Sequence, residues 1–274
     1  MNDVLRGSAW SRFWNRGRWW KAVILAVAYL VLYELASLAF IPLVPFAGDE
    51  GSASFVFILY VLPILVGALI LVVFGATTGW LRGLFARQPI GGRGWMWIAV
   101  VVVLLFNVLH LLSIDYSAAG IDYVMTWLLA GLFIGFAEEV LTRGYVVRIM
   151  RDAGHREIVV ALVSAGLFAL LHSTNLLGGQ ALVPTLVQIV YTFFFGILMY
   201  LAMRVTRTLL APVLLHASTD PSIFMHAQYP VEGTLGSIAN LGNIVVIIVG
   251  LALVFFVRGR VDRKGELTFT SPSR

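Results

Sequence analysis

The stretch Phe136-Ala137-Glu138-Glu139-Val140-Leu141-Thr142-Arg143-Gly144-Tyr145 places two carboxylates and a guanidinium inside an apolar run long enough to span a membrane. Ionised side chains in hydrocarbon are costly, and they are kept only where they face a protein interior or a water-filled cavity. Glu139 and Arg143 are four residues apart, so they share one helix face and can pair. Glu138 points about 100° away and is left unpaired, which suits a general base. The competing interpretation is a structural ion network that fixes this helix.

The whole chain has the composition of a helical membrane protein. Of its 274 residues, 60% are hydrophobic and 12% are charged, and the mean hydropathy is +0.92. Apolar runs of about 20 residues, the length that spans a bilayer, recur along the sequence with no linker long enough for a second domain. We therefore expect an all-α, polytopic membrane protein with eight transmembrane helices, at about residues 22–44, 54–78, 95–113, 122–148, 157–173, 181–203, 208–228 and 236–257.

Cysteine usage and net charge exclude some classes of site and partner. The sequence has no cysteine, so disulfides, thiolate metal ligands and cysteine nucleophiles are excluded. The net charge is +5. In a membrane protein such an excess usually reflects basic cytoplasmic loops beside anionic lipid, and we expect no nucleic-acid partner.

The basic residues predict the orientation of the chain. All Lys and Arg residues except Arg143 fall before the first apolar run, after the last, or in every second loop between runs. The remaining loops contain only acidic charges, at Asp49, Glu50, Asp115, Asp122 and Glu232. Because cytoplasmic loops are enriched in Lys and Arg, we expect an integral multi-pass protein with both termini in the cytoplasm.

Two terminal segments flank the predicted transmembrane domain. Residues 1–21 mix Arg with Trp and Phe, which is typical either of a helix lying on the cytoplasmic leaflet or of a poorly ordered basic tail. The transmembrane domain covers residues 22–257, and its polar side chains gather in residues 122–228, the expected catalytic core. Residues 258–274 are predicted to form a polar cytoplasmic tail.

Two further apolar runs carry ionisable residues. His172 ends one of them, and His216 lies four residues before Asp220 in another, so that the latter two share a helix face. Pro221 disfavours helical geometry at Asp220 and would free backbone groups, which are tolerated at membrane depth where they line a cavity. If each is considered without the other polar residues, His172 can be a helix-end residue, and His216 and Asp220 can be a structural polar pair. Helix rise places both histidines and Glu138 at compatible depths, so we expect one shared site.

Two other polar residues inside apolar runs have no such neighbours. Glu34 and His110 each sit alone in a predicted span. We expect them to serve in packing or gating.

The order and spacing of these residues resemble the CPBP family of intramembrane proteases, which includes CAAX-processing endoproteases and bacteriocin-processing enzymes and is also called the Abi family. The resemblance covers about residues 122–220. Its four motifs are matched by Glu138-Glu139-x-x-x-Arg143-Gly144-Tyr145, by Phe168-x-x-x-His172, by Gly196 with Thr206, Leu209 and His216, and by His216-x-x-x-Asp220. Three positions depart from the family pattern: Tyr200 stands for a second Gly, Arg207-Thr208 for Gly-Ser, and Asp220 for the Asn of well-understood members.

The resemblance implies peptide-bond hydrolysis within or at the membrane, on a membrane protein or a lipidated peptide. Glu138 with His172 would activate a water, and His216 with Asp220 would stabilise the oxyanion. Glu139, Arg143 and Phe168 would support them. Because an ionised Asp cannot donate a hydrogen bond, Asp220 would act either in its protonated form or by orienting and charging His216.

Metal dependence stays open at the level of sequence. His172, His216 and Glu138 are ligand types that catalytic zinc uses, but a metal-free glutamate mechanism needs the same residues. Zinc is therefore the one cofactor to test. Two other classes remain: a non-catalytic scaffold, immunity factor or assembly subunit within a membrane complex, and a proton-coupled transporter, although the sequence shows no repeated halves.

Overall fold

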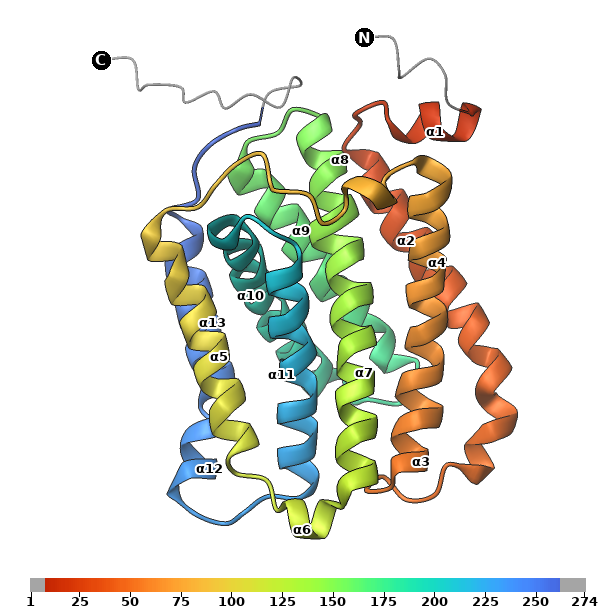
Figure 1. Ribbon diagram of the computed structural model, residues 1–274, viewed down its shortest axis with the longest axis vertical. Helices are drawn as coiled ribbons and strands as arrows, with labels where there is room; N and C mark the ends of the chain where they lie inside the picture. Colours follow the sequence, from red (N-terminus) through yellow and green to blue (C-terminus); the bar gives the residue numbers. More distant parts are fainter. Residues whose placement is uncertain (1–7, 262–274) are drawn as a thin grey trace.

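The computed structural model describes residues 8–261, and these fold into one bundle of helices with no strand among them (Figure 1). The long helices run nearly side by side along the bundle, and short helical turns join or extend them. The α-helices are α1 (Ala9–Trp14), α2 (Trp20–Ser37), α3 (Ala53–Val56), α4 (Leu62–Thr78), α5 (Trp97–Leu111), α6 (Tyr116–Ala119), α7 (Ile121–Glu139), α8 (Val147–Asp152), α9 (Glu157–Leu171), α10 (Leu182–Thr206), α11 (Leu210–Gln228), α12 (Thr234–Ala239) and α13 (Gly242–Val254). The other helical segments are η1 (Leu38–Phe46), η2 (Phe57–Val61), η3 (Leu81–Gly83), η4 (Gly94–Met96), η5 (Val140–Val146) and η6 (His172–Leu176).

Within residues 8–261, seven helical segments are long and apolar enough to cross a membrane. They are Trp20–Phe46, Ala53–Thr78, Gly94–Leu111, Ile121–Asp152, Glu157–Leu176, Leu182–Thr206 and Thr234–Val254. Each overlaps one of the predicted spans, which confirms an all-α, multi-pass integral membrane protein. The predicted span 208–228 forms α11, a helix of 19 residues that falls outside this set. Its polar residues, which include His216 and Asp220, lower its hydropathy. They are tolerated because α11 packs between α5 and α7, as Figure 1 shows, with His216 buried against the other helices.

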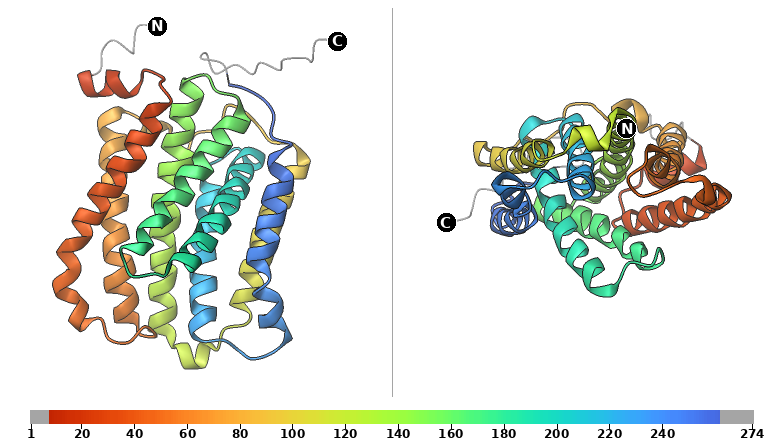
Figure 2. Two further views of the ribbon diagram at one scale, coloured as in Figure 1. Left: turned by 180° about the vertical axis from the view of Figure 1, so that it is seen from behind. Right: turned by 90° about the horizontal axis from the view of Figure 1, so that it is seen from below.

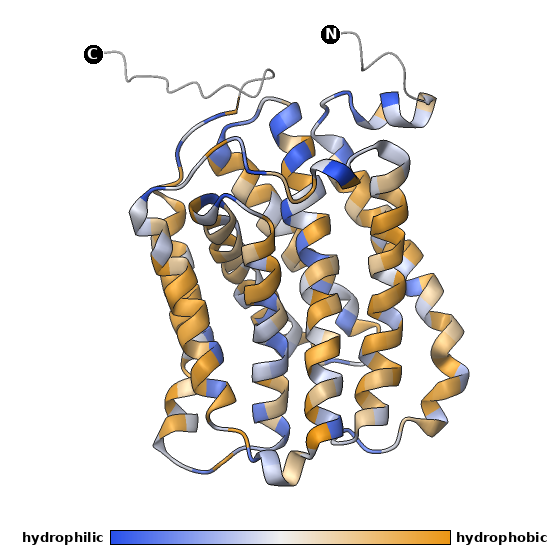
Figure 3. Ribbon diagram, viewed as in Figure 1, coloured by the Kyte–Doolittle hydropathy of each residue, from blue (hydrophilic) through white to orange (hydrophobic). Residues whose placement is uncertain are grey.

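The outer surface of the bundle is apolar along its length (Figure 3). Large side chains that no other part of the described chain covers include Leu69, Val101 and Ile248, which are 53%, 59% and 59% exposed. Such a surface suits lipid, since a water-facing protein rarely exposes a continuous apolar patch of this extent. The blue, hydrophilic residues in Figure 3 gather at the end of the bundle near α1 and inside α7 and α11.

Two glycines let α7 and α11 approach closely. A methyl group added to Gly135 would lie 2.6 Å from the carbonyl oxygen of Val213, and one added to Gly131 would overlap the Pro221 ring. Small residues four apart allow two transmembrane helices to pack backbone against backbone. This contact places the polar residues of α11 directly against Glu138 and Glu139 at the end of α7.

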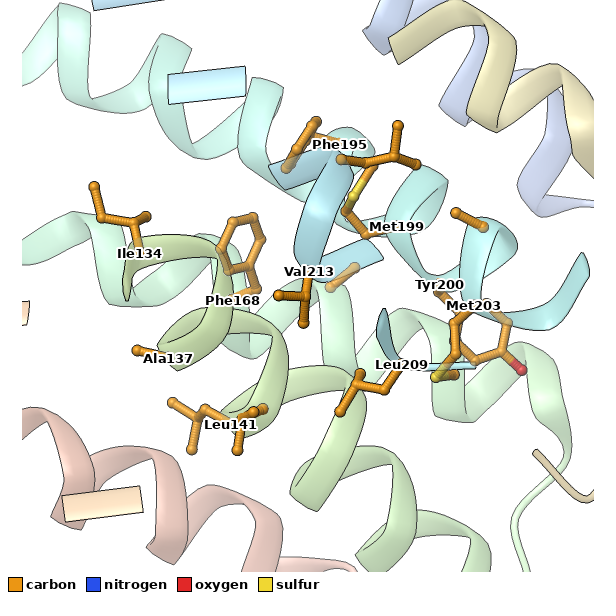
Figure 4. Packing of buried hydrophobic residues seen from close by; sticks show 14 of the residues in the cluster. Ile134, Ala137, Leu141, Phe168, Phe195, Met199, Tyr200, Met203, Leu209 and Val213 are labelled. Atoms are coloured by element: carbon orange, nitrogen blue, oxygen red, sulfur yellow. The ribbon is translucent and has the colours of Figure 1, made fainter. Parts of the chain in front are cut away.

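After these residues the helix widens into a π-helical turn, η5. Two side-chain hydroxyls donate hydrogen bonds to backbone carbonyls in this region. Thr142 Oγ1 donates to the Glu138 carbonyl at 2.5 Å, and Ser164 Oγ donates to the Thr142 carbonyl at 3.0 Å. Side chains such as Ala137, Leu141 and Phe168 fill the core around this turn (Figure 4). The segment is therefore held from within the helix and from α9.

The connection between α9 and α10 lies part-way along the bundle and not at its far end, as Figure 2 shows. α9 has only 15 residues, about 22 Å of helix. His172, the first residue of η6, is therefore positioned inside the bundle at the depth of Glu138, as the sequence predicts.

The N-terminal segment contains a short helix, α1, that packs against the end of the bundle. Trp14 is only 5% exposed, and its ring lies edge-on to Phe74 with centroids 5.0 Å apart. Lys21 donates to the carbonyl oxygens of Phe13 and Arg16. Of the predicted polar tail 258–274, residues 262–274 lie outside the described residues.

Candidate active site

The two glutamates of α7 and two residues of α11 form one polar cluster. His216 Nε2 lies 3.4 Å from Glu138 Oε2 and 3.9 Å from Asp220 Oδ2, while His216 Nδ1 lies 2.9 Å from Glu139 Oε1. The side chains of His216 and Glu139 are 3% and 0% exposed, whereas those of Glu138 and Asp220 are 23% and 26% exposed. The cluster thus has a closed side, at Glu139, and an open side where Glu138 and Asp220 can meet a substrate.

Glu139 and Arg143 form the buried ion pair that their spacing predicts. Arg143 Nη1 donates to Glu139 Oε1 at 3.0 Å, with neither side chain exposed, and donates to Thr142 Oγ1 at 2.6 Å. The guanidinium carbon lies 4.6 Å from the centre of the Phe168 ring, a cation–π contact. Arg143 therefore anchors Glu139, and Glu139 in turn accepts from His216.

Gly196 of α10 explains why the third sequence motif contains a glycine. A methyl group at this position would lie 2.8 Å from Arg143 Nη2 and 3.1 Å from the Cα of Ala165. The missing side chain makes room for the guanidinium between α9 and α10. This room is what allows a charged arginine to be kept in the middle of the bundle.

His172 joins the cluster from α9 through a shared aromatic ring and a shared cavity. Its Nδ1 lies 3.0 Å from the Phe168 carbonyl, which can only accept, so Nδ1 carries the proton and Nε2 is free to accept. The Phe168 ring lies edge-on to both His172 and His216, with centroids 5.0 and 5.7 Å away. A cavity of about 130 Å³ is lined by both His172 and Glu138. That volume holds several water molecules, which a hydrolytic site requires.

The sequence analysis missed two features of this site. The first is that Glu139 makes the orienting contact with His216. Asp220, which we expected to act either in its protonated form or by orienting and charging His216, lies 3.9 Å from His216 Nε2, beyond hydrogen-bond distance. Tyr29 and Tyr33 of α2 also line the cavity with Glu138. Their spacing of four residues on a largely apolar helix was the only available signal, because nothing in a single sequence indicates that α2 packs against η5 and α9, beside this cavity.

The zinc hypothesis finds no support in the arrangement of these side chains. Within residues 8–261, no three His, Cys, Asp or Glu side chains are grouped so that they could hold a metal ion. Both ring nitrogens of His216 face carboxylates, and His172 shares only a cavity with them. The residues as arranged therefore do not fit a zinc site.

A second buried ion network lies in the half of the bundle nearer α1. Glu157, which is 0% exposed, accepts from Arg151 at 2.9 and 2.7 Å and from Arg204 at 3.2 Å. The hydroxyl of Tyr200 also donates to Glu157. Tyr200 is the residue that departs from the usual glycine, and here it ties α10 to α9, so the departure adds a contact.

The two isolated polar residues have different environments. His110 is 6% exposed, donates from Nδ1 to the Phe106 carbonyl at 2.9 Å, and packs its ring 5.3 Å from that of His226. It is a packing residue. Glu34 instead lines a cavity beside the cluster.

One family model matches part of this chain, over the helices that hold the cluster. Residues 120–221 match the model of the family described as type II CAAX prenyl endopeptidase Rce1-like, which belongs to the CPBP family. This range includes Glu138, His172, His216 and Asp220. Searches of curated proteins and of solved structures gave no match. The family resemblance read from the motifs is confirmed over this region.

Proposed function

We propose that the chain is an intramembrane endopeptidase, because residues 120–221 match the type II CAAX prenyl endopeptidase Rce1-like model of the CPBP family. Its substrates are membrane proteins or lipidated peptides. The observation that carries the proposal is one polar cluster centred on His216. Its Nε2 lies 3.4 Å from Glu138 Oε2 and 3.9 Å from Asp220 Oδ2, and His172 lines the same cavity as Glu138.

The proposed reaction is a metal-free hydrolysis. Glu138 takes a proton from a water that the free Nε2 of His172 positions, and the water oxygen bonds to the peptide carbonyl carbon. His216, protonated at both nitrogens, donates from Nε2 to the resulting oxyanion. When the intermediate collapses, the carbon–nitrogen bond breaks and Glu138 delivers its proton to the leaving amine. Glu139 and Arg143 hold His216 in place throughout.

The test of this function compares peptide termini in membranes from cells that produce either the intact protein or the Glu138→Gln form. New termini that depend on Glu138 would support the protease and identify its substrates. If none appears although both forms are inserted in equal amounts, the chain is better explained as a non-catalytic scaffold, immunity or assembly subunit that keeps the family fold.

Asp220 separates two ways of stabilising the oxyanion. Asp220→Asn is expected to keep most of kcat, because the amide can donate a hydrogen bond where the carboxylate acts only through its charge near His216. Asp220→Ala has neither the charge of Asp nor the donor of Asn, and we expect kcat to fall roughly 10²- to 10³-fold, a loss as large as that of one oxyanion donor. The measurement is kcat for both variants on one substrate. Equal losses in Asn and Ala would show that the charge itself is essential.

The proposed orientation has both termini in the cytoplasm and α11 as an eighth span. Reporter fusions after Asp49, Asp115 and Glu232 are expected outside, and fusions after Arg87, Asp152 and the C-terminus inside, because Lys and Arg are absent from the former loops. Fusions in the loops that flank α11, after Arg207 and after Glu232, should report opposite sides. A reproducible result on the same side would remove α11 from the spans.

A further inference from the structure

A second cavity continues from the catalytic one toward the end of the bundle away from α1. It has a volume of about 580 Å³ and lies between α2 with η1, the start of α4 and η6. Tyr33, Thr174 and Asn175 line both cavities, so the two are neighbours across these three residues. A peptide bound with its scissile bond at Glu138 can therefore extend into the second cavity, which we name the Glu34 cavity.

Glu34 is the charged side chain of the Glu34 cavity. The other described residues that line it are apolar or uncharged, and none is Lys, Arg or His. Glu34 is half-buried, and within residues 8–261 its carboxylate has no hydrogen bond and no ion pair. A carboxylate at membrane depth is costly unless it meets a countercharge or water, and such residues mark functional sites. A cationic group on a bound peptide would supply the countercharge.

The position of Glu34 limits where that cation sits on a bound peptide. Leu30 lines the catalytic cavity, and Glu34 lies four residues further along α2 on the same face. The two positions are about 6 Å apart along the helix axis. An extended peptide advances about 3.3 Å per residue, so this offset corresponds to about two residues of substrate, and side-chain reach adds about two more.

We propose that Glu34 is a specificity-determining residue that binds a Lys or Arg side chain of the substrate within about four residues of the scissile bond. The apolar lining, with Leu38, Ile41 and Leu59 among its residues, accepts the hydrophobic substrate segment around that basic side chain. This inference rests on the proposed protease function and adds to it the substrate class: apolar membrane segments that carry a basic residue beside the cleavage site.

The first experiment compares new peptide termini in membranes from cells that produce wild type, Glu34→Gln, Glu34→Lys or Glu138→Gln. Cleavage sites that require Glu138 should be enriched in Lys or Arg within about four residues. Glu34→Gln should lower the yield of these products, and Glu34→Lys should shift the preference toward Asp or Glu. Glu50→Gln, an exposed carboxylate in the neighbouring loop, is the matched control and should behave as wild type.

The second experiment uses purified protein in lipid nanodiscs and synthetic peptides of one cleaved sequence, with the basic residue either kept or replaced by Gln. For the basic peptide, Glu34→Gln should raise KM roughly 10- to 100-fold, the effect of one charge-assisted hydrogen bond, with little change in kcat. For the Gln peptide the two proteins should have similar KM values.

The outcomes separate this proposal from the one it rests on. If no termini depend on Glu138, the protease function fails and the assignment of Glu34 fails with it. If Glu138-dependent sites appear without basic enrichment, or if Glu34→Gln leaves KM for the basic peptide unchanged, the protease stands and Glu34 has no part in specificity.

Discussion

Glu138→Gln is expected to lower kcat for peptide cleavage roughly 10²- to 10⁴-fold, the usual contribution of a general base, while the protein still folds and inserts. Gln keeps the shape of the side chain but cannot take a proton from water. Glu138 is also one of the two partly exposed members of the cluster, at 23%, and Arg143 is held by Glu139, so the substitution leaves no buried charge without a partner. The measurement is kcat of purified protein in nanodiscs, with insertion checked by gel filtration and thermal unfolding.

Glu139→Gln provides the contrast to this variant. It weakens the buried pair with Arg143 and the contact with His216, so its main expected effect is a loss of stability of roughly 3–5 kcal/mol. Full activity of the purified Glu138→Gln protein would contradict the assignment of Glu138 as the general base. A pattern in which Glu139→Gln alone abolishes turnover, without loss of stability, would instead exchange the roles of the two glutamates.

Glu157→Gln is expected to reduce the free energy of unfolding by roughly 3–5 kcal/mol, because it leaves Arg151 and Arg204 without their buried countercharge. The carboxylate of Glu157 is fully enclosed and accepts from both arginines and from Tyr200. Activity per folded molecule should change little, since Glu157 lies outside the catalytic cavity. Unfolding in mixed detergent micelles, followed by circular dichroism, measures the loss.

Asp152→Asn is the matched control for Glu157. Asp152 pairs with Arg148 at 3.7 Å on the surface, where the two side chains are 44% and 41% exposed. An exposed pair of this kind contributes at most about 1 kcal/mol. Similar losses for Asp152→Asn and Glu157→Gln would mean that the buried network adds nothing beyond a surface pair.

Contacts within one helix could be predicted from the sequence, and contacts between helices largely could not. The Glu139–Arg143 pair follows from helix periodicity alone and is present at 3.0 Å. The Glu139–His216 contact joins residues 77 positions apart, and it depends on how closely the glycines of α7 let α11 approach. Helix rise predicted that the polar residues meet at one depth, but not which carboxylate would face which ring nitrogen.

The buried network around Glu157 was missed for a related reason. Arg151, Glu157 and Arg204 lie at the ends of apolar runs, where the sequence favours loop charges at the cytoplasmic surface. The structure folds them inward, with 7%, 0% and 3% exposure. Arg207 is a similar case: it takes the left-handed conformation, φ 61°, at the end of α10, where the family usually has glycine. Its backbone carbonyl and side chain both bond to Gln88, which holds it in that conformation.

The π-helical turn between α7 and α8 has a consequence for how this helix tolerates insertions and deletions. A π turn holds one residue more than the α-helical path needs, so every residue after it is turned by about 100° relative to those before. Upstream lies the carboxylate pair; downstream, Tyr145 donates to the Leu71 carbonyl at 3.0 Å and Arg148 stacks on Trp80. Removing one residue between Val140 and Val146 would make the helix regular. It would also turn either the two glutamates, or Tyr145 and Arg148, away from their partners. The extra residue therefore sets the angle about the helix axis between the residues before η5 and those after it, and a chain of this fold has to keep it.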